Sequence, residues 1–303
     1  MNKKPNIFVI IVTYKGERWY DKCFSSLRES TIPVQTVVVD NSPSEEDVNY
    51  IKEHFPEVHV IKTEENLGFG RANNLGMRYA LDNGCDYVFL LNQDAWIESD
   101  TIEKLVKVAE KYEEYGIISP IHLNADHTAI NMTLGIGDHY RNNQLLSDLY
   151  VNKLQDVYDT NYANAAAWLL PRKTLETIGG FCPIIFQYGE DDDYAHRVLY
   201  HGYKIGVVPS ARIVHDSKNK LELSKKLYDR AQWDDIDGFL DINQTKSLSS
   251  IRRYLFRKRI VCFLHGQKGR YQFYTYRYKF LCEHQKEIER CMAAHRIKQA
   301  NWL

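Results

Sequence analysis

The segment Tyr87-Val-Phe-Leu-Leu91, followed at once by Asn92-Gln93-Asp94, decides the fold class of this chain. Its first five residues are apolar without polar alternation, which is typical of a strand buried on both faces of a mainly parallel sheet. Open α/β sheets bind ligands at the carboxyl ends of their strands. We therefore expect Asp94 to lie where it could hold a divalent cation against a phosphate, although Asn and Asp are also ordinary turn residues.

Strand and helix patterns alternate through the first hundred residues. This alternation predicts a parallel sheet with right-handed crossovers and with helices on both faces. The predicted strands cover 7–13, 34–39, 58–61 and 87–91, and the predicted helices cover 18–30, a stretch from 44 and 70–81.

The second half of the chain is less regular. Residues 120–165 are polar and predict loops and short antiparallel strands over the binding edge of the sheet. A strand over 165–170, helices over 172–178 and 188–197, and a last strand over 204–208 closed by Pro209 follow. We expect an α/β domain over 1–215 and a helical extension, basic and rich in aromatic residues, over 216–303.

The net charge of −1 hides an asymmetry. Residues 251–303 hold 13 Lys and Arg against 3 Asp and Glu, which leaves 26 basic and 37 acidic residues in the first 250. The six cysteines show no C-x-x-C spacing and predict reduced thiols. The apolar run 7–12 is too short for a signal peptide, and no stretch approaches the length of a membrane span. We expect a cytoplasmic protein, with peripheral contact at the inner face of the cell membrane left open.

Three predicted strands end in polar groups that could hydrogen-bond a nucleotide: Thr13-Tyr14, Asp40-Asn41-Ser42 and Asn92-Gln93-Asp94. Asp40 could accept from a base N–H or a ribose hydroxyl, and Thr13 could contact the base. Any one of the three could simply cap a turn. All three belong to the same predicted edge of the sheet, which favours a binding site.

The segment Asn66-Leu-Gly-Phe-Gly-Arg-Ala-Asn-Asn74 precedes and opens a predicted helix. Its glycines permit close backbone approach, and Arg71 would add a charged fork to the anion-binding N–H groups of a helix N-terminus. The spacing matches neither G-x-G-x-x-G nor the Walker loop, and a structural glycine turn is the alternative.

Four adjacent carboxylates, Glu190 to Asp193, open the helix over 188–197. Acidic residues favour a helix N-terminus through its dipole, which is the plain structural interpretation. Their mutual repulsion can also raise a pKa and keep a base poised. His215 follows the last strand at the same edge, where it is either a metal or phosphate contact or an ordinary structural histidine.

In order, these pieces resemble the family-2 inverting glycosyltransferases of the GT-A fold, with a Rossmann-like nucleotide-binding half. The matching segments, which span about residues 6–216, are Ile11-Val-Thr-Tyr14, Val38-Val-Asp-Asn-Ser42, Asn66 to Asn74, Leu90-Leu-Asn-Gln-Asp94, Gly189-Glu-Asp191 and Val214-His215. The Asn-Leu-Gly-Phe-Gly segment and the Asn-Gln-Asp variant are most similar to the rhamnosyltransferase-type branch that builds bacterial surface polysaccharides.

The resemblance implies roles for individual residues. Asp40, with Thr13 beside it, matches the aspartate that binds the nucleobase or ribose. Asp94 matches the last carboxylate of the D-x-D motif, which coordinates Mg²⁺ or Mn²⁺ on the donor diphosphate, and His215 matches a position near that metal. Asp191 matches the base that deprotonates the acceptor hydroxyl. Further donor-binding residues are expected at Tyr14, Asn41, Asn66, Gly68, Arg71, Asn74, Asn92 and Gln93, and acceptor or orienting residues at Trp168 and Glu190.

The implied activity is transfer of a sugar from a UDP- or dTDP-sugar, dTDP-rhamnose included, to a hydroxyl of a saccharide or lipid-linked acceptor. Asn92 replaces the first aspartate of the D-x-D motif and supplies no charge. This replacement is the one feature that favours the alternative of a catalytically silent nucleotide-sugar-binding or scaffold protein. A sugar-nucleotide pyrophosphorylase is a further alternative, because it would share the general fold. Such an enzyme would need a Gly-rich N-terminal loop, and residues 12–17 are a poor substitute for that loop.

Residues 251–280 interleave basic and aromatic side chains. Such a mixture suits the interface of an anionic membrane, where lipid-linked acceptors reside. Packing of these aromatics on the catalytic domain, or on a second subunit in a homodimer, is the alternative. We expect no nucleic acid as a partner, because no RNA-binding motif is present and the rest of the chain is acidic.

Overall fold

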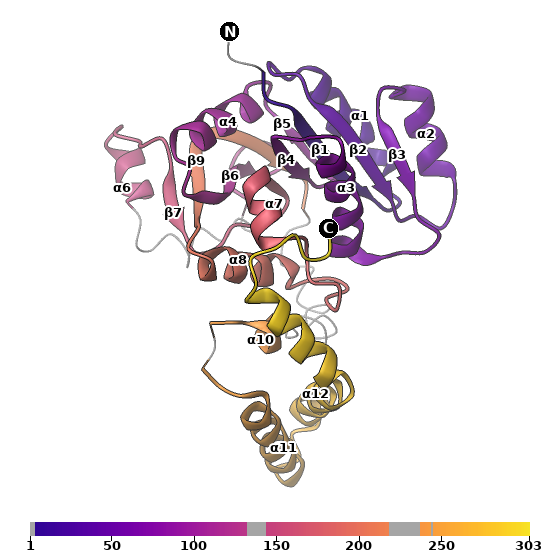
Figure 1. Cartoon of the computed structure of the whole chain (residues 1–303), viewed down its shortest axis with the longest axis vertical. Helices are drawn as coiled ribbons and strands as arrows, with labels where there is room; N and C mark the ends of the chain where they lie inside the picture. The colour runs from indigo at the N-terminus through magenta and orange to yellow at the C-terminus, as the bar shows by residue number, and fades with distance from the viewer. Residues whose placement is uncertain (1–3, 132–143, 218–236, 244) are drawn as a thin grey trace.

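The computed structural model describes residues 4–131, 144–217, 237–243 and 245–303 (Figure 1). Its strands are β1 (Ile7–Thr13), β2 (Gln35–Asp40), β3 (His59–Lys62), β4 (Tyr87–Leu91), β5 (Ala95–Ile97), β6 (Tyr115–Leu123), β7 (Tyr158–Thr160), β8 (Ala167–Pro171) and β9 (Lys204–His215). They form one sheet in the order β3-β2-β1-β4-β8-β6-β9-β5, with β7 paired to β9.

The described helices are α1 (Glu17–Arg28), α2 (Glu46–His54), α3 (Gly68–Asp82), α4 (Thr101–Lys111), α6 (Leu145–Tyr150), α7 (Arg172–Ile178), α8 (Glu190–Tyr200), α10 (Asp237–Leu240), α11 (Leu248–Leu264) and α12 (Lys268–His295). Helices α1, α2 and α4 pack on one face of the sheet, and α3, α7 and α8 pack on the other. The prediction of helices on both faces is therefore confirmed. Within the described ranges, none of the helices combines the length and the apolar character that a bilayer crossing requires.

Strand β1 shows how the sequence produces these two layers. Its side chains alternate between the faces, so that Val9 joins Phe24 of α1 in one core and Ile10 joins Met77 of α3 in the other. Each of these side chains is almost fully buried. Burying one of them stabilises the fold by about 1.5 to 3 kcal/mol before entropy is counted. A strand that is apolar on both faces thus requires helices on both faces.

Strand direction places the polar strand ends at one edge of the sheet. Strands β3, β2, β1 and β4 are parallel, while β8 runs antiparallel between β4 and β6. The carboxyl ends of β1, β2 and β4 therefore meet at the same edge as the start of β8. The predicted α/β class is confirmed, and the parallel arrangement that the sequence predicts gives way to a mixed sheet beyond β4.

Two elements near this edge differ from the prediction. Strand β9 does not stop at Pro209 but continues to His215, because a bulge opposite β6 accommodates the proline. Strand β5, which the sequence pattern did not reveal, pairs antiparallel with the end of β9, and Ala95 lies opposite His215. Within the predicted irregular region, β6 extends to Leu123, while 132–143 lie outside the described residues.

The C-terminal helices form a third apolar cluster with the loop that precedes α8, where Ile185 packs with residues of α10, α11 and α12. Residues 299–303 then return to the α/β layers: the N–H of Gly180 donates to the Asn301 carbonyl at 2.8 Å, and the N–H of Gln299 donates to the Thr177 carbonyl at 3.0 Å. The end of the chain accordingly lies beside α7 (Figure 1). A domain boundary between 215 and 216 stays a prediction.

Candidate nucleotide-binding and active site

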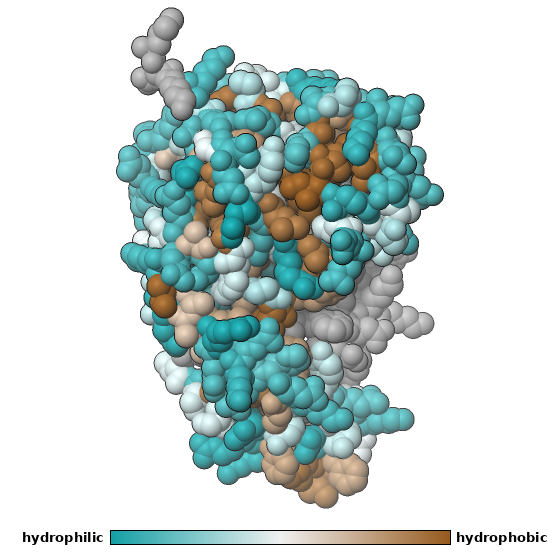
Figure 2. All heavy atoms as spheres, turned by 45° about the vertical axis from the view of Figure 1, so that its right-hand side comes forward, coloured by the Kyte–Doolittle hydropathy of each residue, from teal (hydrophilic) through white to brown (hydrophobic). Residues whose placement is uncertain are grey.

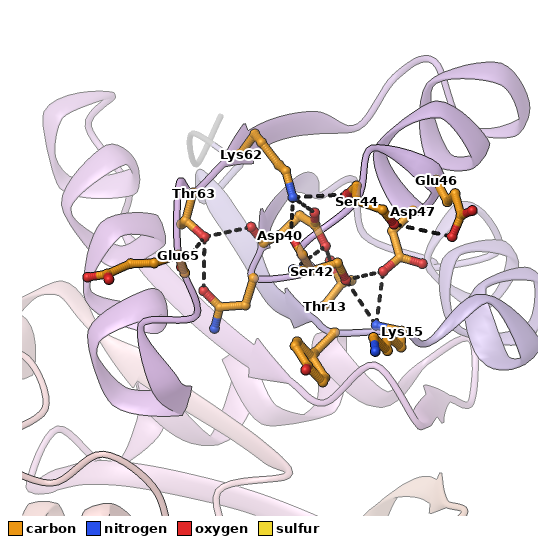
Figure 3. A network of polar contacts seen from close by, with 12 residues as sticks. Thr13, Lys15, Asp40, Ser42, Ser44, Glu46, Asp47, Lys62, Thr63 and Glu65 are labelled. Carbon is orange, nitrogen blue, oxygen red and sulfur yellow. Dashed lines mark hydrogen bonds and ion pairs between the residues drawn. The ribbon is translucent and has the colours of Figure 1, made fainter.

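A buried carboxylate at the end of β2 organises the first part of the site (Figure 3). Asp40 has no exposed surface. Its Oδ1 accepts from the Thr13 hydroxyl at 2.9 Å and from the Ser42 N–H at 3.3 Å, and its Oδ2 accepts from Lys62 Nζ at 2.8 Å. Thr13 and Asp40, both predicted from strand ends, are therefore in direct contact. A nucleobase that reaches the Asp40 carboxylate must displace one of these donors.

Lys62 is a residue of this site that the sequence reasoning missed. It ends β3, the one neighbouring strand whose end was not compared with those of β1, β2 and β4. Its ammonium also contacts the Ser42 carbonyl and the Ser44 carbonyl, so it closes the network around Asp40. A groove of about 490 Å³ lies beside it, lined by Lys62, Thr63, Glu64, Glu65, Leu67 and Leu75.

The loop after β1 is held against the loop after β4. The side-chain amide of Gln93 accepts from the Tyr14 N–H at 2.9 Å and donates to the Tyr14 carbonyl at 3.2 Å. The N–H of Lys15 binds the Ser42 hydroxyl at 3.0 Å and Asp47 Oδ2 at 2.9 Å. These bonds leave the Tyr14 ring exposed at the edge of the sheet. Gln93 thus ties the Asn-Gln-Asp loop to the loop after β1.

Helix α3 is joined to the end of β2 through Asn41. Its side chain accepts from the Leu67 N–H at 3.3 Å and donates to the Gly68 carbonyl at 3.1 Å. Asn66 Oδ1 accepts from the Gly68 N–H at 2.9 Å. Arg71, one turn into the helix, uses its Nε to bind the Leu67 carbonyl at 2.8 Å. All four predicted residues therefore lie around the N-terminus of α3.

Two predicted site residues lie deeper than the sequence suggested. Asn74 forms a pair of hydrogen bonds with the backbone of Phe181, at 2.9 and 2.7 Å. Trp168 is fully buried, with its ring among those of Phe181 and Tyr194 and its Nε1 donating to the Ala163 carbonyl at 3.2 Å. β8 directs the indole into the core beneath α8, and an acceptor or orienting role for Trp168 stays a prediction.

The metal expectation rests on Asp94 and His215. Asp94 Oδ1 lies 3.4 Å from His215 Nε2, and the Asp94 carbonyl accepts from the Asp216 N–H at 2.9 Å. His215 is nearly buried, and its Nδ1 has no hydrogen-bond partner in the described chain. Among the described residues, no group of three or more His, Cys, Asp or Glu side chains converges as a metal site. The pair fits a divalent cation only if a bound diphosphate supplies further oxygen ligands.

His122 packs against this pair from the neighbouring strand. Its ring meets that of His215 edge to face at a centroid distance of 6.1 Å. Burial, with the proximity of His215 as the second cause, holds the pKa of His122 well below its usual value. His122 is therefore neutral near neutral pH and adds no positive charge beside Asp94.

Asp191, the predicted base, lies in the first turn of α8. The Tyr162 hydroxyl donates to its Oδ2 at 2.5 Å, and the Asp192 N–H donates to its Oδ1 at 3.1 Å. Burial raises the pKa of Asp191, and the hydrogen bond from Tyr162, followed by those from the backbone of Asp192 and Ala165, limits this rise. Burial and the adjacent Asp191 charge raise the pKa of Tyr162 as well, so its phenol stays protonated and keeps donating.

The other acids of the cluster have different surroundings. Asp193 is buried and forms an ion pair with Arg197 at 3.0 Å, and Arg197 also donates to the Ile178 and Gly180 carbonyls. His295 of α12 lies 3.5 Å from Asp193, and burial lowers the pKa of His295 to about 4. Asp193 therefore holds Arg197, which ties α8 to the end of α7, and it packs against His295 of α12 rather than facing a substrate. Glu190 is buried beside Gly70 of α3.

A short segment, 162–166, connects the two halves of the candidate active site. At one end the Tyr162 hydroxyl donates to Asp191 at 2.5 Å, and at the other end the Ala166 carbonyl accepts from the Asn92 N–H at 2.9 Å. The segment that leads into β8 thus contacts both the candidate base and the Asn-Gln-Asp loop. Tyr162 is the second residue that the sequence reasoning missed, since nothing in the irregular region distinguishes it.

Known proteins share this sequence pattern and fold. The chain is 27% identical over 228 residues to the low-salt glycan biosynthesis hexosyltransferase Agl10 of Haloferax volcanii, covering 74% of this chain and 72% of that protein. It is 25% identical over 211 residues to the dTDP-rhamnosyl transferase RfbF of Shigella flexneri, covering 69% of each.

The fold matches a solved structure of the mannosyltransferase PcManGT from Pyrobaculum calidifontis in complex with GDP-Man and Mn²⁺. The TM-score is 0.58 at 19% identity, over 97% of this chain and 74% of that one. The family profile described as Glycosyl transferase family 2 matches residues 8–164, more than half of the chain. This protein belongs to glycosyl transferase family 2.

Proposed function

We propose that this chain is a metal-dependent inverting glycosyltransferase that uses a nucleoside-diphosphate sugar. The family membership supports glycosyl transfer, and the similarity to a dTDP-rhamnosyl transferase supports a donor of the UDP- or dTDP-sugar class, with dTDP-rhamnose as the first candidate. The acceptor in this proposal is a hydroxyl of a saccharide or of a lipid-linked saccharide in bacterial surface polysaccharide synthesis.

The observation that carries the proposal is the connection between Asp191 and the Asn-Gln-Asp loop through residues 162–166. A base and a diphosphate-binding carboxylate must have a fixed separation if an acceptor oxygen is to meet the anomeric carbon opposite the leaving group. Contacts of both with one short segment would fix such a separation. A protein that only bound nucleotides would need no such link.

The nucleotide would lie along the edge formed by β1, β2 and β3. Asp40 and Thr13 would hold the base or ribose, and Lys62, already in contact with Asp40, would move aside or take part in the contact. The diphosphate would then lie near the N-terminus of α3, where Arg71 and the positive end of the helix dipole favour negative charge.

Asp94 and His215 would hold a divalent cation, Mg²⁺ or Mn²⁺, together with diphosphate oxygens. When bound, the cation would neutralise charge on the leaving nucleoside diphosphate. Asn92 gives this site one negative charge fewer than a D-x-D motif. We accordingly expect the cation to bind weakly until the donor is present.

The chemical step needs one base. Asp191 would take the proton of the acceptor hydroxyl as that oxygen forms a bond to the anomeric carbon. The bond from this carbon to the diphosphate oxygen breaks in the same displacement, its electrons leave with the nucleoside diphosphate, and the centre is inverted. The raised pKa of Asp191 suits this task, because a stronger base accepts the proton more readily.

Donor hydrolysis by purified protein tests the proposal. A panel of UDP-, dTDP- and GDP-sugars is assayed with Mg²⁺, Mn²⁺ or EDTA for the wild type, Asp94→Ala, Asp191→Asn and the matched control Asp192→Asn. We expect slow, metal-dependent release of one nucleoside diphosphate. Loss of Asp191 should lower the rate by about 10² to 10⁴-fold, and loss of Asp192 only a few-fold, because a general base contributes that much and a neighbouring carboxylate does not.

The same experiment separates the alternatives. Tight nucleotide binding without turnover, even with candidate acceptors added, would indicate the silent binding protein that Asn92 alone favours. The family match leaves the pyrophosphorylase alternative without support. Absence of binding to every nucleotide in the panel would refute the proposed function.

A further inference from the structure

One stretch near the end of the chain contains basic residues and no acidic residue. Residues 242–282 contain 10 Lys and Arg and neither Asp nor Glu. This stretch contains all of α11 and the first half of α12, which form a helical hairpin with Gly266 in its turn, at φ +65°. We call residues 257–271, at the turn of this hairpin, the hairpin tip.

The hairpin tip projects away from the body of the protein. The buried residues of α12 are Leu281 and three residues C-terminal to it, so the first turns of this helix have no contact with the α/β layers that buries them. Aromatic pairs join the two helices instead, such as Phe256 with Tyr278 and Phe263 with Tyr271, at centroid distances of 5.7 and 5.6 Å. Figure 1 shows α11 at the end of the molecule opposite the sheet.

Large apolar side chains remain exposed at the hairpin tip in spite of this pairing. Phe263 is 67% exposed and Leu264 is 73% exposed, and Ile260 and Val261 are exposed beside them. Figure 2 shows brown, hydrophobic atoms together at this lower end of the molecule. Four neighbouring apolar side chains at a projecting turn form an exposed apolar patch, and such patches are typical of binding surfaces.

Five cations flank these apolar side chains in the sequence: Arg257, Lys258, Arg259, Lys268 and Arg270. None of them forms an ion pair with a carboxylate in the described part of the chain, and Lys258 and Arg259 lie over aromatic rings of the hairpin itself. Among the described residues, the positive charge of the tip is therefore not compensated by an ion pair with a carboxylate.

We propose that the hairpin tip docks on an anionic membrane surface. Val261, Phe263 and Leu264 enter the interface between headgroups and acyl chains, and the five cations contact the anionic headgroups. Aliphatic side chains gain nothing from a phosphate backbone, which argues against nucleic acid as the occupant. Two copies of the tip would repel each other, which argues against a dimer through this surface.

Vesicle co-sedimentation tests the docking. The full chain is mixed with phosphatidylcholine vesicles that contain about 30 mole per cent phosphatidylglycerol, or none, at low and high salt. We expect at least tenfold tighter binding to the anionic vesicles, weakened by salt. Two double variants, F263E with L264E and K258E with K268E, should each lose at least tenfold of this binding.

A matched control places the same charges on another exposed apolar surface. Leu146 and Tyr150 of α6 are 58% and 90% exposed, so L146E with Y150E adds two carboxylates without touching the tip. This control should bind like the wild type, and all variants should keep the wild-type circular dichroism and donor hydrolysis. Unchanged hydrolysis separates a failure of docking from a failure of the proposed function.

Three results would overturn the inference. These are equal binding to neutral and anionic vesicles, equal loss of binding in the α6 control, and retention of an RNA oligonucleotide but not of vesicles. Self-association abolished by F263E with L264E, in the absence of vesicle binding, would assign the tip to a second copy instead.

Discussion

Replacing Tyr162 by Phe should shift the pH dependence of turnover, because its hydroxyl donates to the candidate base Asp191 at 2.5 Å. A hydrogen bond to a charged group contributes about 1.5 to 3 kcal/mol. At 1.36 kcal/mol per pKa unit, loss of this bond should raise the pKa of Asp191 by roughly one to two units. The backbone bonds from Ala165 and Asp192 remain in the variant, so we expect the lower end of this range.

The sign of the shift follows from the role of the base. Asp191 acts as a carboxylate, so activity falls as the pH drops through the pKa of Asp191. The acid limb is the part of the pH–rate profile where activity falls with decreasing pH. The hydrogen bond from Tyr162 stabilises the carboxylate and so keeps the acid limb at low pH. Its removal moves the acid limb to higher pH. The rate at high pH, where Asp191 is ionised in both proteins, should change much less than the rate at low pH.

The assay is release of nucleoside diphosphate from the preferred donor across about pH 4 to 8, with water in place of the acceptor hydroxyl. Tyr115→Phe is the matched control, because the Tyr115 hydroxyl donates to Asp159 at the same distance of 2.5 Å but at the opposite edge of the sheet. An acid limb that is identical in the wild type and in Tyr162→Phe would refute the assignment of Asp191 as the base.

Three further changes test how the site is supported. Gly68→Ala and its control Gly84→Ala both place Ala at positive φ, which destabilises the fold by about 1 to 2 kcal/mol. At residue 68 the new Cβ would also lie 2.0 Å from the backbone oxygen of Phe186, whereas at residue 84 it would meet no atom within 4 Å. The donor KM should therefore rise for Gly68→Ala alone. Trp168→Ala should lower the free energy of unfolding, measured in urea, by about 3 to 5 kcal/mol. A loss of glycosyl transfer at unchanged stability would instead support contact between Trp168 and the acceptor. Trp302→Ala removes the ring that lies against the Arg197 guanidinium of α8, and it should lower the free energy of unfolding by roughly 1 to 2 kcal/mol. An unchanged Tm would show that the returning C-terminal segment does not stabilise α8.

The sequence alone determined the parallel half of the fold. Strands such as 7–13 and 87–91 are apolar on both faces, and only a sheet covered by helices on both sides buries such strands. The strand ends also predicted Thr13, Asp40 and Asp94 as candidate site residues, because the chain changes abruptly from apolar to polar there. Local patterns were sufficient wherever neighbours in sequence are also neighbours in the structure.

The remaining features depend on contacts between distant residues. The pairing of Ala95 with His215 brings Asp94 beside that histidine across more than a hundred residues, and no local pattern indicates this register. Tyr162 lies in an irregular segment, and Lys62 ends a strand whose neighbour is known only from the sheet order. The local pattern alone could not separate Asp191 from Asp193, since both are acids in the first turn of one helix, and only the family resemblance singled out Asp191. Only the packing of Arg197 and His295 against Asp193, and of Tyr162 against Asp191, gives these two carboxylates different surroundings.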